Sequence, residues 1–430
     1  MNTQTRKVLV LGGGIAGLTA AWELSRQNVS VELVEKSCFL GGHSIGFTCK
    51  ATDKCQQCGA CSVEEMLKNV VNEPLINVHL RTEITQLKKT GQSEKPYGFT
   101  ATLAKSDVEI PAGKVIKGFS RYNAPLYVVA KTSDSEISQA GVSDTESTNA
   151  KPCACSRSKA VSTNRCGIDN MGTEGELGVD AVIVATGYSP FDPDRKSTYG
   201  YDKWKNVITG LDLENIIREN GVLVRPSDGQ KPQRVAFIQC VGSRDERLGN
   251  LWCSEVCCPY AMRMAGSVKN DNPDADITMF YIDIQNTGKE FPVFYEKIKQ
   301  NIRFVRTIPV DLYPLDNDRL ELRHMAEDEG SPSSEAFDLV VLSVGIMPGK
   351  DTVKISEITG ISVTQDGFLD NAVSSLPARS CSCGTSSRSG SPVAGCFVAG
   401  TAGGPGSIAA TIADAGKIAF ESMKYLGVMR

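Results

Sequence analysis

A glycine-rich turn near the N-terminus is the feature that most constrains how this chain folds. An apolar run leads into G-G-G-I-A-G at 12–17, and after a helical stretch a second apolar run ends at Glu35. This order predicts a βαβ unit in which Gly12 permits a tight turn, Gly14 lets the backbone approach a pyrophosphate and Gly17 allows close helix packing. The pyrophosphate would lie at the helix N-terminus, and Glu35 would accept hydrogen bonds from an adenosine ribose. The sequence therefore predicts an adenine dinucleotide site.

Length and charge limit the classes to which the chain can belong. Its 430 residues exceed one ordinary core, so we expect at least two domains. The 46 Lys and Arg against 50 Asp and Glu give a net charge of −4, and nucleic acid is not an expected partner. No signal peptide is recognised, and no apolar run approaches the roughly 20 residues that span a bilayer. We expect a cytoplasmic protein without its own membrane span.

The cysteine content points to metal or redox chemistry. The chain has 15 cysteines, and in a reducing cytosol clustered cysteines indicate metal or redox centres more often than disulfides. Only three histidines are present, which leaves few members for hydrolytic triads or histidine-rich zinc sites.

The first part of the chain combines strands with two polar segments. A cysteine segment at 49–61 precedes alternating stretches at 78–85 and 98–103, which predict an inserted antiparallel β meander. Residues 131–178 are rich in small polar residues and predict a long surface insertion. A buried strand then ends in A-T-G at 185–187, a signature typical of the point where a flavin domain passes the chain to a second domain.

The middle of the chain predicts a second βαβ unit. Its strands are expected at 234–240 and 276–282, with a helix at about 253–268 between them. A further strand at 337–345 resembles the A-T-G strand and is expected to return the chain to the first domain. We predict an α/β flavoprotein with two nested Rossmann-like domains, divided into a first FAD-binding part at 1–190, a second αβ domain at 191–335 and a second FAD-binding part at 336–430.

The C-terminal segment predicts the surroundings of a flavin ring. Glycines at 400–406 precede a helix that begins near Ile408, and a helix N-terminus stabilises negative charge on a reduced isoalloxazine. No catalytic side chain is expected, because the cofactors carry the redox chemistry. The expected FAD-binding residues come from the glycine turns and strand ends: Gly12, Gly14, Ile15, Ala16, Gly17, Glu35, Lys36, Ala185, Thr186, Gly187, Gly400, Thr401, Pro405, Ser407 and Ile408.

The second βαβ unit lacks a glycine loop and carries cysteines in its place. Four of them, Cys240, Cys253, Cys257 and Cys258, match the demand of a [4Fe-4S] cubane for one thiolate per iron. The missing loop disfavours NAD(P)H binding there. Zinc in a scaffold protein is the main alternative, although paired C-x-x-C knuckles are missing, and buried structural cysteines are the third.

A second cysteine group has several interpretations. Cys55, Cys58 and Cys61 have ferredoxin-like spacing with three ligands, and Cys49 or Cys38 could supply a fourth. They could hold a second cluster, form a redox dithiol of an NAD(P)H-dependent disulfide reductase, or be structural. No role is expected for the remaining cysteines of the polar segments: Cys153, Cys155, Cys166, Cys381 and Cys383.

Several segments together resemble the A subunit of heterodisulfide reductase. The resemblance covers nearly the whole chain outside the two polar loops, but the C-x-x-C-x-x-C-x-x-x-C-P motifs of the methanogen protein do not occur here. The segments are the glycine motif, G-G-H at 41–43 before Cys55-x-x-Cys58, F-I-Q-C-V-G-S-R-D at 237–245, C-x-x-x-C-C at 253–258, and G-P at 404–405 with Ile408.

The resemblance implies a thioredoxin-reductase-like flavoprotein whose cysteine quartet binds an iron-sulfur cluster, with Gly41, Gly42 and His43 added to the flavin site. Because it lacks the additional cysteine motifs of the methanogen protein, the chain is most similar to the A subunits of quinone-interacting membrane-bound oxidoreductase complexes of sulfur-metabolising bacteria. That implies sibling flavin, iron-sulfur and quinone-binding membrane subunits, a link from menaquinone to adenylylsulfate reductase, and a peripheral position on the inner face of the cytoplasmic membrane. Heterodisulfide-reductase-like subunits of sulfur-oxidising complexes are the alternative.

Overall fold

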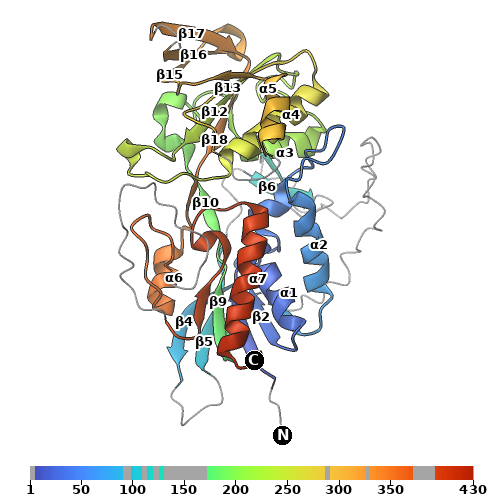
Figure 1. Cartoon of the computed structure of the whole chain (residues 1–430), viewed down its shortest axis with the longest axis vertical. Coiled ribbons are helices and arrows are strands. Elements are labelled where there is room, and N and C mark those ends of the chain that lie inside the picture. The colour runs from blue at the N-terminus through green and yellow to red at the C-terminus, as the bar shows by residue number, and fades with distance from the viewer. Residues whose placement is uncertain are drawn as a thin grey trace, which may run out of the picture.

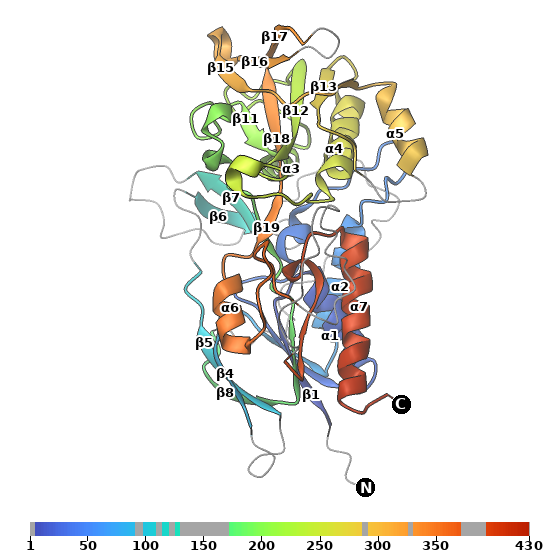
Figure 2. The same cartoon turned by 60° about the vertical axis from the view of Figure 1, so that its left-hand side comes forward.

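Two α/β halves stacked along the long axis make up the chain (Figures 1 and 2). Each half is built on a five-stranded parallel sheet. The cysteines at 153, 155, 166, 381 and 383 and most of the 131–178 insertion lie outside the described residues. The structure, a computed structural model, describes residues 5–90, 98–108, 114–119, 125–129, 172–285, 291–325, 330–370 and 393–429.

The first sheet contains the predicted N-terminal βαβ unit. Its strands run parallel in the order β20 (Cys396–Val398), β9 (Ala181–Val184), β1 (Lys7–Leu11), β2 (Ser30–Val34) and β3 (Ile76–His79).

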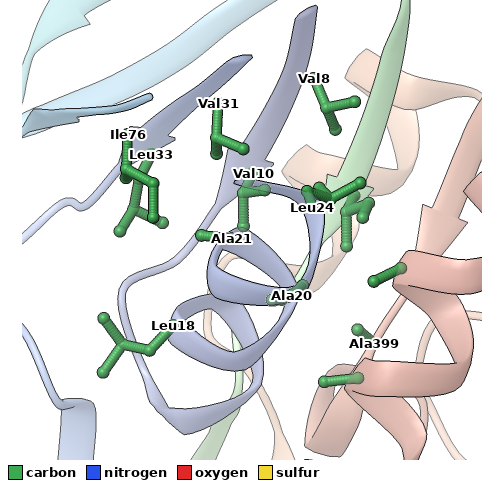
Figure 3. Close-up of a cluster of buried hydrophobic side chains, with 14 of the residues drawn as sticks. Val8, Val10, Leu18, Ala20, Ala21, Leu24, Val31, Leu33, Ile76 and Ala399 are labelled. Carbon is green, nitrogen blue, oxygen red and sulfur yellow. The ribbon is translucent and has the colours of Figure 1, made fainter. Parts of the chain in front are cut away.

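Alternate residues of β1 supply both faces of this sheet. Val8 and Val10 belong to the same buried cluster as Leu18 and Leu24 of α1 (Ile15–Ser25) (Figure 3). Helix α1 lies between α2 (Ala60–Val71) and α7 (Ile408–Tyr425) (Figure 1). The opposite face packs against an antiparallel meander of β4 (Thr82–Lys89), β5 (Phe99–Lys105) and β8 (Gly175–Val179), and against α6 (Thr352–Thr359). The predicted meander is therefore present and closes one side of the sheet.

The second sheet has the same three-layer plan. Its parallel strands are β11 (Val207–Thr209), β18 (Leu339–Val344), β12 (Arg234–Val241), β13 (Asp276–Phe280) and β14 (Arg303–Val305). One face packs against α3 (Gly210–Asn220), α4 (Cys257–Asp271) and α5 (Phe291–Lys299). The other packs against an antiparallel sheet of β15 (Asp311–Pro314), β16 (Leu320–Met325) and β17 (Pro332–Phe337).

Two short antiparallel pairs complete the sheets. The pair formed by β10 (Tyr188–Pro190) and β19 (Ile346–Pro348) lies where the chain passes between the halves, and β6 (Lys114–Phe119) pairs with β7 (Pro125–Val129). Among the described residues, no helix combines the length and apolar character that crossing a bilayer requires.

Three boundaries differ from the sequence expectations. β18 pairs with β12 of the second sheet, although its residues were expected to belong with 336–430. Residues 175–178 of the expected insertion belong to β8, because they pair with β5. The helix expected from residue 253 begins at Cys257. The α/β fold with nested parallel sheets is confirmed, and the exact domain boundaries stay predictions.

Candidate functional site

A cavity of about 430 Å³ lies at the carboxyl ends of the first sheet's strands, the usual ligand position in open parallel sheets. Four expected residues do not border it within the described part of the chain: Gly17, Lys36, Gly400 and Pro405. The other fourteen predicted flavin-site residues line it: Gly12, Gly14, Ile15, Ala16, Glu35, Gly41, Gly42, His43, Ala185, Thr186, Gly187, Thr401, Ser407 and Ile408.

The glycine turn has the geometry that a pyrophosphate needs. Gly12 has a φ of 104°, and a Cβ there would lie 2.3 Å from the carbonyl oxygen of Ala185. A Cβ at Gly17 would lie 1.8 Å from the carbonyl oxygen of Gly12, so this glycine serves helix packing. Gly14 instead has no atom within 4 Å of an added Cβ, and no side chain caps α1 behind it. The N–H groups of the first turn of α1 are therefore available to an anion.

Glu35 is fixed by backbone hydrogen bonds at the end of β2. Its Oε2 accepts from the Gly13 N–H at 2.7 Å, and its Oε1 accepts from the Ser37 N–H at 2.7 Å. A carboxylate has about four acceptor sites, so both oxygens can still accept from a ligand. The residue borders the cavity, which fits the predicted contact with ribose hydroxyls.

Three residues predicted to bind FAD, namely Lys36, Gly400 and Ser407, make contacts within the protein. The Nζ of Lys36 pairs with Asp351 at 2.8 Å and Glu83 at 3.6 Å. A Cβ at Gly400 would lie 2.6 Å from the Cβ of Ala16, so this glycine lets the chain approach α1. The hydroxyl of Ser407 accepts from the Ala410 N–H at 3.2 Å and caps α7, whose N-terminus lines the cavity.

The second βαβ unit brings the cysteine quartet together at the N-terminus of α4. Cys257 shares hydrogen bonds with Cys240 and Cys258, and Cys253 interacts electrostatically with Cys257. The backbone around them is strained, because Cys240 near the end of β12 and Glu255 before α4 have φ values of 58° and 60°. Cys257 also lines the flavin cavity.

Burial and the neighbouring thiols favour the neutral form of the quartet cysteines. The hydrogen bond with Cys240, together with burial, raises the pKa of Cys257 well above that of a free thiol. The hydrogen bond with Cys257 and burial raise the pKa of Cys258, and burial raises that of Cys253. A coordinated metal deprotonates such thiols, since it supplies the missing positive charge.

The quartet supplies four soft thiol donors, which suit both iron-sulfur clusters and zinc. Within the described residues, no three His, Cys, Asp or Glu side chains are arranged to hold one metal ion. A cubane is larger than one ion, and it takes one soft thiolate on each of its four irons. The four cysteines supply that number of thiolates.

The second cysteine group lies against the same helix. Cys58 lines the cavity, whereas Cys55 and Cys61 are exposed. The Nε of Arg263 in α4 donates to the carbonyl oxygen of Gln56 at 2.8 Å, and its guanidinium interacts electrostatically with the thiols of Cys55 and Cys58. Cys38 and Cys49 are half-buried. The interpretation of this group stays open.

Sequence reasoning missed a buried ion pair at the cavity. Lys50 pairs with Glu214 of α3, and their side chains are 2% and 1% exposed. The Tyr260 hydroxyl donates to the carbonyl oxygen of Gly210 at 3.0 Å and lies 3.1 Å from Glu214 Oε1. Tyr260 follows Cys257 by three residues in α4, so its place on the same helix face could have been predicted. No local signal links Lys50 to Glu214.

Most of the chain is similar in sequence to A subunits of heterodisulfide reductases. It is 31% identical over 441 residues to the A subunit of the ferredoxin/F(420)H(2)-dependent CoB-CoM heterodisulfide reductase of Methanosarcina acetivorans, covering 98% of this chain and 53% of that protein. It is also 31% identical over 436 residues to the iron-sulfur A subunit of the CoB–CoM heterodisulfide reductase of Methanocaldococcus jannaschii, covering 95% and 63%. The chain is homologous to the A subunit of heterodisulfide reductase. It spans between about half and just under two thirds of the length of these relatives.

Two further comparisons concern the fold. Residues 10–55 match the family model described as "NAD(P)-binding Rossmann-like domain". Thioredoxin reductase of Lactococcus lactis superposes with a TM-score of 0.54 at 12% identity, covering 99% of this chain and 100% of that one. Thioredoxin reductase of T. acidophilum gives 0.52 at 12% identity, covering 98% and 99%. The expected thioredoxin-reductase-like fold is confirmed.

Proposed function

We propose that this chain is an FAD- and iron-sulfur-containing electron-transfer subunit of a multi-subunit oxidoreductase. The observation that carries the proposal is the shared cavity wall, because Cys257 of the quartet borders the same cavity as Gly14 of the dinucleotide turn. A bound flavin would convert between two-electron and one-electron steps, and a [4Fe-4S] cluster would take single electrons. The relatives are named as reductase subunits, in one case an iron-sulfur subunit.

The residues of this chain would position both groups. The N–H groups that follow Gly14 would bind the pyrophosphate, and Glu35 would accept from the ribose hydroxyls. The N-terminus of α7 at Ile408 would stabilise negative charge on the ring. Arg244 pairs with Asp283, and its guanidinium also interacts with Cys240 and Cys253, so it would offset part of the thiolate charge.

The cellular role in this proposal is a link between menaquinone and cytoplasmic sulfur metabolism. Sibling flavin and iron-sulfur subunits and a quinone-binding membrane subunit would hold the chain at the inner face of the cytoplasmic membrane, with adenylylsulfate reductase as electron partner. The resemblance of the chain to the A subunits of quinone-interacting membrane-bound oxidoreductase complexes supports this assignment. Reduction of the isolated native complex by a menaquinol analogue tests it, and a complex that has no quinone-binding subunit would favour the sulfur-oxidising alternative.

The cofactor content is the direct test. Anaerobically purified protein should show flavin bands and, per chain, about four irons and four sulfides, since each quartet thiolate binds one iron. Dithionite should produce a cubane signal in low-temperature EPR. Flavin without iron, or zinc without acid-labile sulfide, would contradict the proposal.

A dithiol reductase is the second candidate function, favoured by the position of Cys58. This thiol borders the cavity, and a Cβ on the neighbouring Gly59 would lie 3.0 Å from Ile408 at the N-terminus of α7. NAD(P)H as its reductant is disfavoured, because the quartet lies at the N-terminus of α4, where a second pyrophosphate would bind. Rapid bleaching of the flavin by NADPH, with loss of disulfide reduction in Cys58→Ser, would support this function over electron transfer alone.

A further inference from the structure

A buried side chain beside the quartet has no hydrogen-bond partner among the described residues. Gln239 in β12 is 1% exposed, and both its Nε2 and its Oε1 lack a partner there. Burying a carboxamide without hydrogen bonds costs free energy, so buried amides are paired in nearly all folded proteins. An unpaired one therefore indicates a partner other than the described residues.

The strand pattern indicates which side of the sheet this amide faces. Val235 and Phe237 of β12 pack in the same core as Cys257 and Cys258, whereas Ile238 packs in the opposite core. Neighbouring side chains of a strand point to opposite faces, so Gln239 follows Phe237 toward α4. The register with β18 shifts between Ile238 and Val241, and both of these residues pack in the opposite core, so the irregularity at residues 239–240 leaves Gln239 and Cys240 on the side of α4.

The next residue ties the amide to the quartet. Cys240 follows Gln239 directly and shares a hydrogen bond with Cys257 at the N-terminus of α4. The amide thus lies at the end of β12 on the face where α4 begins. Sulfides and thiolates accept hydrogen bonds but donate none, which makes a sulfur-rich group a chemical match for an –NH2 without an acceptor.

We infer that the Gln239 carboxamide donates an N–H to a sulfur atom of the cluster that the quartet binds. The inference rests on the proposed function and adds a residue that sets the reduction potential. A donor to sulfur stabilises the more negative, reduced cluster and thereby raises its potential. Gln239 would contact the cluster directly and would act on its reduction potential.

The test measures the midpoint potential of the cluster in Gln239→Met, which keeps the length of the side chain and removes both N–H donors. An EPR-monitored redox titration of the holoprotein should give a more negative potential, with iron, sulfide and FAD contents unchanged. Ile238→Val is the matched control, because it changes the adjacent residue on the opposite face and should leave the potential at the wild-type value.

The outcomes separate the inference from the proposed function. An unchanged potential at full iron content would overturn the inference alone, since the amide would then bond to a buried water. Wild-type protein without iron would overturn both.

A second measurement leaves residue 239 unmutated, so it tests the inference even if Gln239→Met does not fold. Protein labelled with side-chain ¹⁵N glutamine should show a ¹⁵N coupling in pulsed EPR of the reduced cluster. The coupling should persist in Gln285→Ala, which removes the glutamine next to Asp283. Absence of the coupling would overturn the inference.

Discussion

The two βαβ units use the same scaffold with different turns. In the first, β1 ends at Leu11 and α1 begins at Ile15, so a three-residue glycine turn opens the helix N-terminus to an anion. In the second, residues 242–256 separate β12 from α4, and cysteines occupy the helix start. The strand and the helix are thus common to both units. The turn between them determines whether backbone N–H groups or cysteine side chains lie at the helix N-terminus.

Removing one thiolate should have the largest effect. Cys253→Ala removes one of the four proposed ligands in the second unit, and we expect iron and sulfide to fall to near zero while FAD stays bound, because the two sites use separate turns. Metal, sulfide and flavin analyses of the same sample measure this. Cys396→Ala is the control, since this buried cysteine belongs to β20 of the first sheet. Full iron content in Cys253→Ala would refute the ligand assignment.

The reciprocal change is Gly14→Asp in the first unit. A carboxylate at this open position would repel the pyrophosphate, and we expect FAD affinity to fall about a hundredfold, roughly 3 kcal/mol, with iron retained. Flavin titration of the apoprotein measures the loss. In Gly416→Asp, the carboxylate enters open space on α7 and should leave FAD binding intact. Equal loss in both variants would argue against a pyrophosphate at Gly14.

Breaking the ion pair between the halves should have a moderate effect. Lys50→Met leaves Glu214 charged and buried, which typically costs about 3–5 kcal/mol, and Glu214→Leu added to it should restore part of that loss. The thermal midpoint of the holoprotein reports both changes. Lys297→Met is the control, because its pair with Asp53 is exposed and screened by solvent, so its loss should leave the thermal midpoint nearly unchanged. A double variant no more stable than Lys50→Met would contradict the expected recovery.

The smallest effect concerns a carboxylate inside the first sheet. Burial raises the pKa of Glu32, but hydrogen bonds with His79 and Lys7 outweigh it, so the pKa is lowered in the folded state. Its contribution is therefore complete above the unfolded pKa and is lost as pH falls through the lower folded value. Glu32→Gln should flatten the acid limb of stability measured against pH. In the second sheet Ala236→Ser, which adds no titratable group, should leave that limb unchanged.

The sequence predicted the features that depend on neighbouring residues. The glycine turn, Glu35 and the start of α7 are local patterns, and the structure gathers them at one cavity. The quartet was predicted from residue type, and its proximity follows from β12 leading to α4. Such local patterns can be predicted from the sequence because a few neighbouring residues determine a turn or a helix start.

Long-range pairings could not be predicted in this way. β18 resembles the A-T-G strand in sequence, yet its sheet is decided by hydrogen bonds to β12 about a hundred residues earlier. The contact of Arg263 with Gln56 and the pairing of Lys50 with Glu214 likewise join distant segments. No propensity or spacing encodes such partners, so a single sequence leaves them open.

The Lys50 and Glu214 pair has a consequence for the timing of electron transfer. It joins a segment after the first βαβ unit to α3 of the second sheet, and the Arg263 contact joins the halves again at α4. Hinge rotation would expose or separate a buried charge pair, at a high cost. We therefore expect the rate of transfer between the two centres to depend on their fixed separation and potentials and to be independent of solvent viscosity, which slows domain rotation.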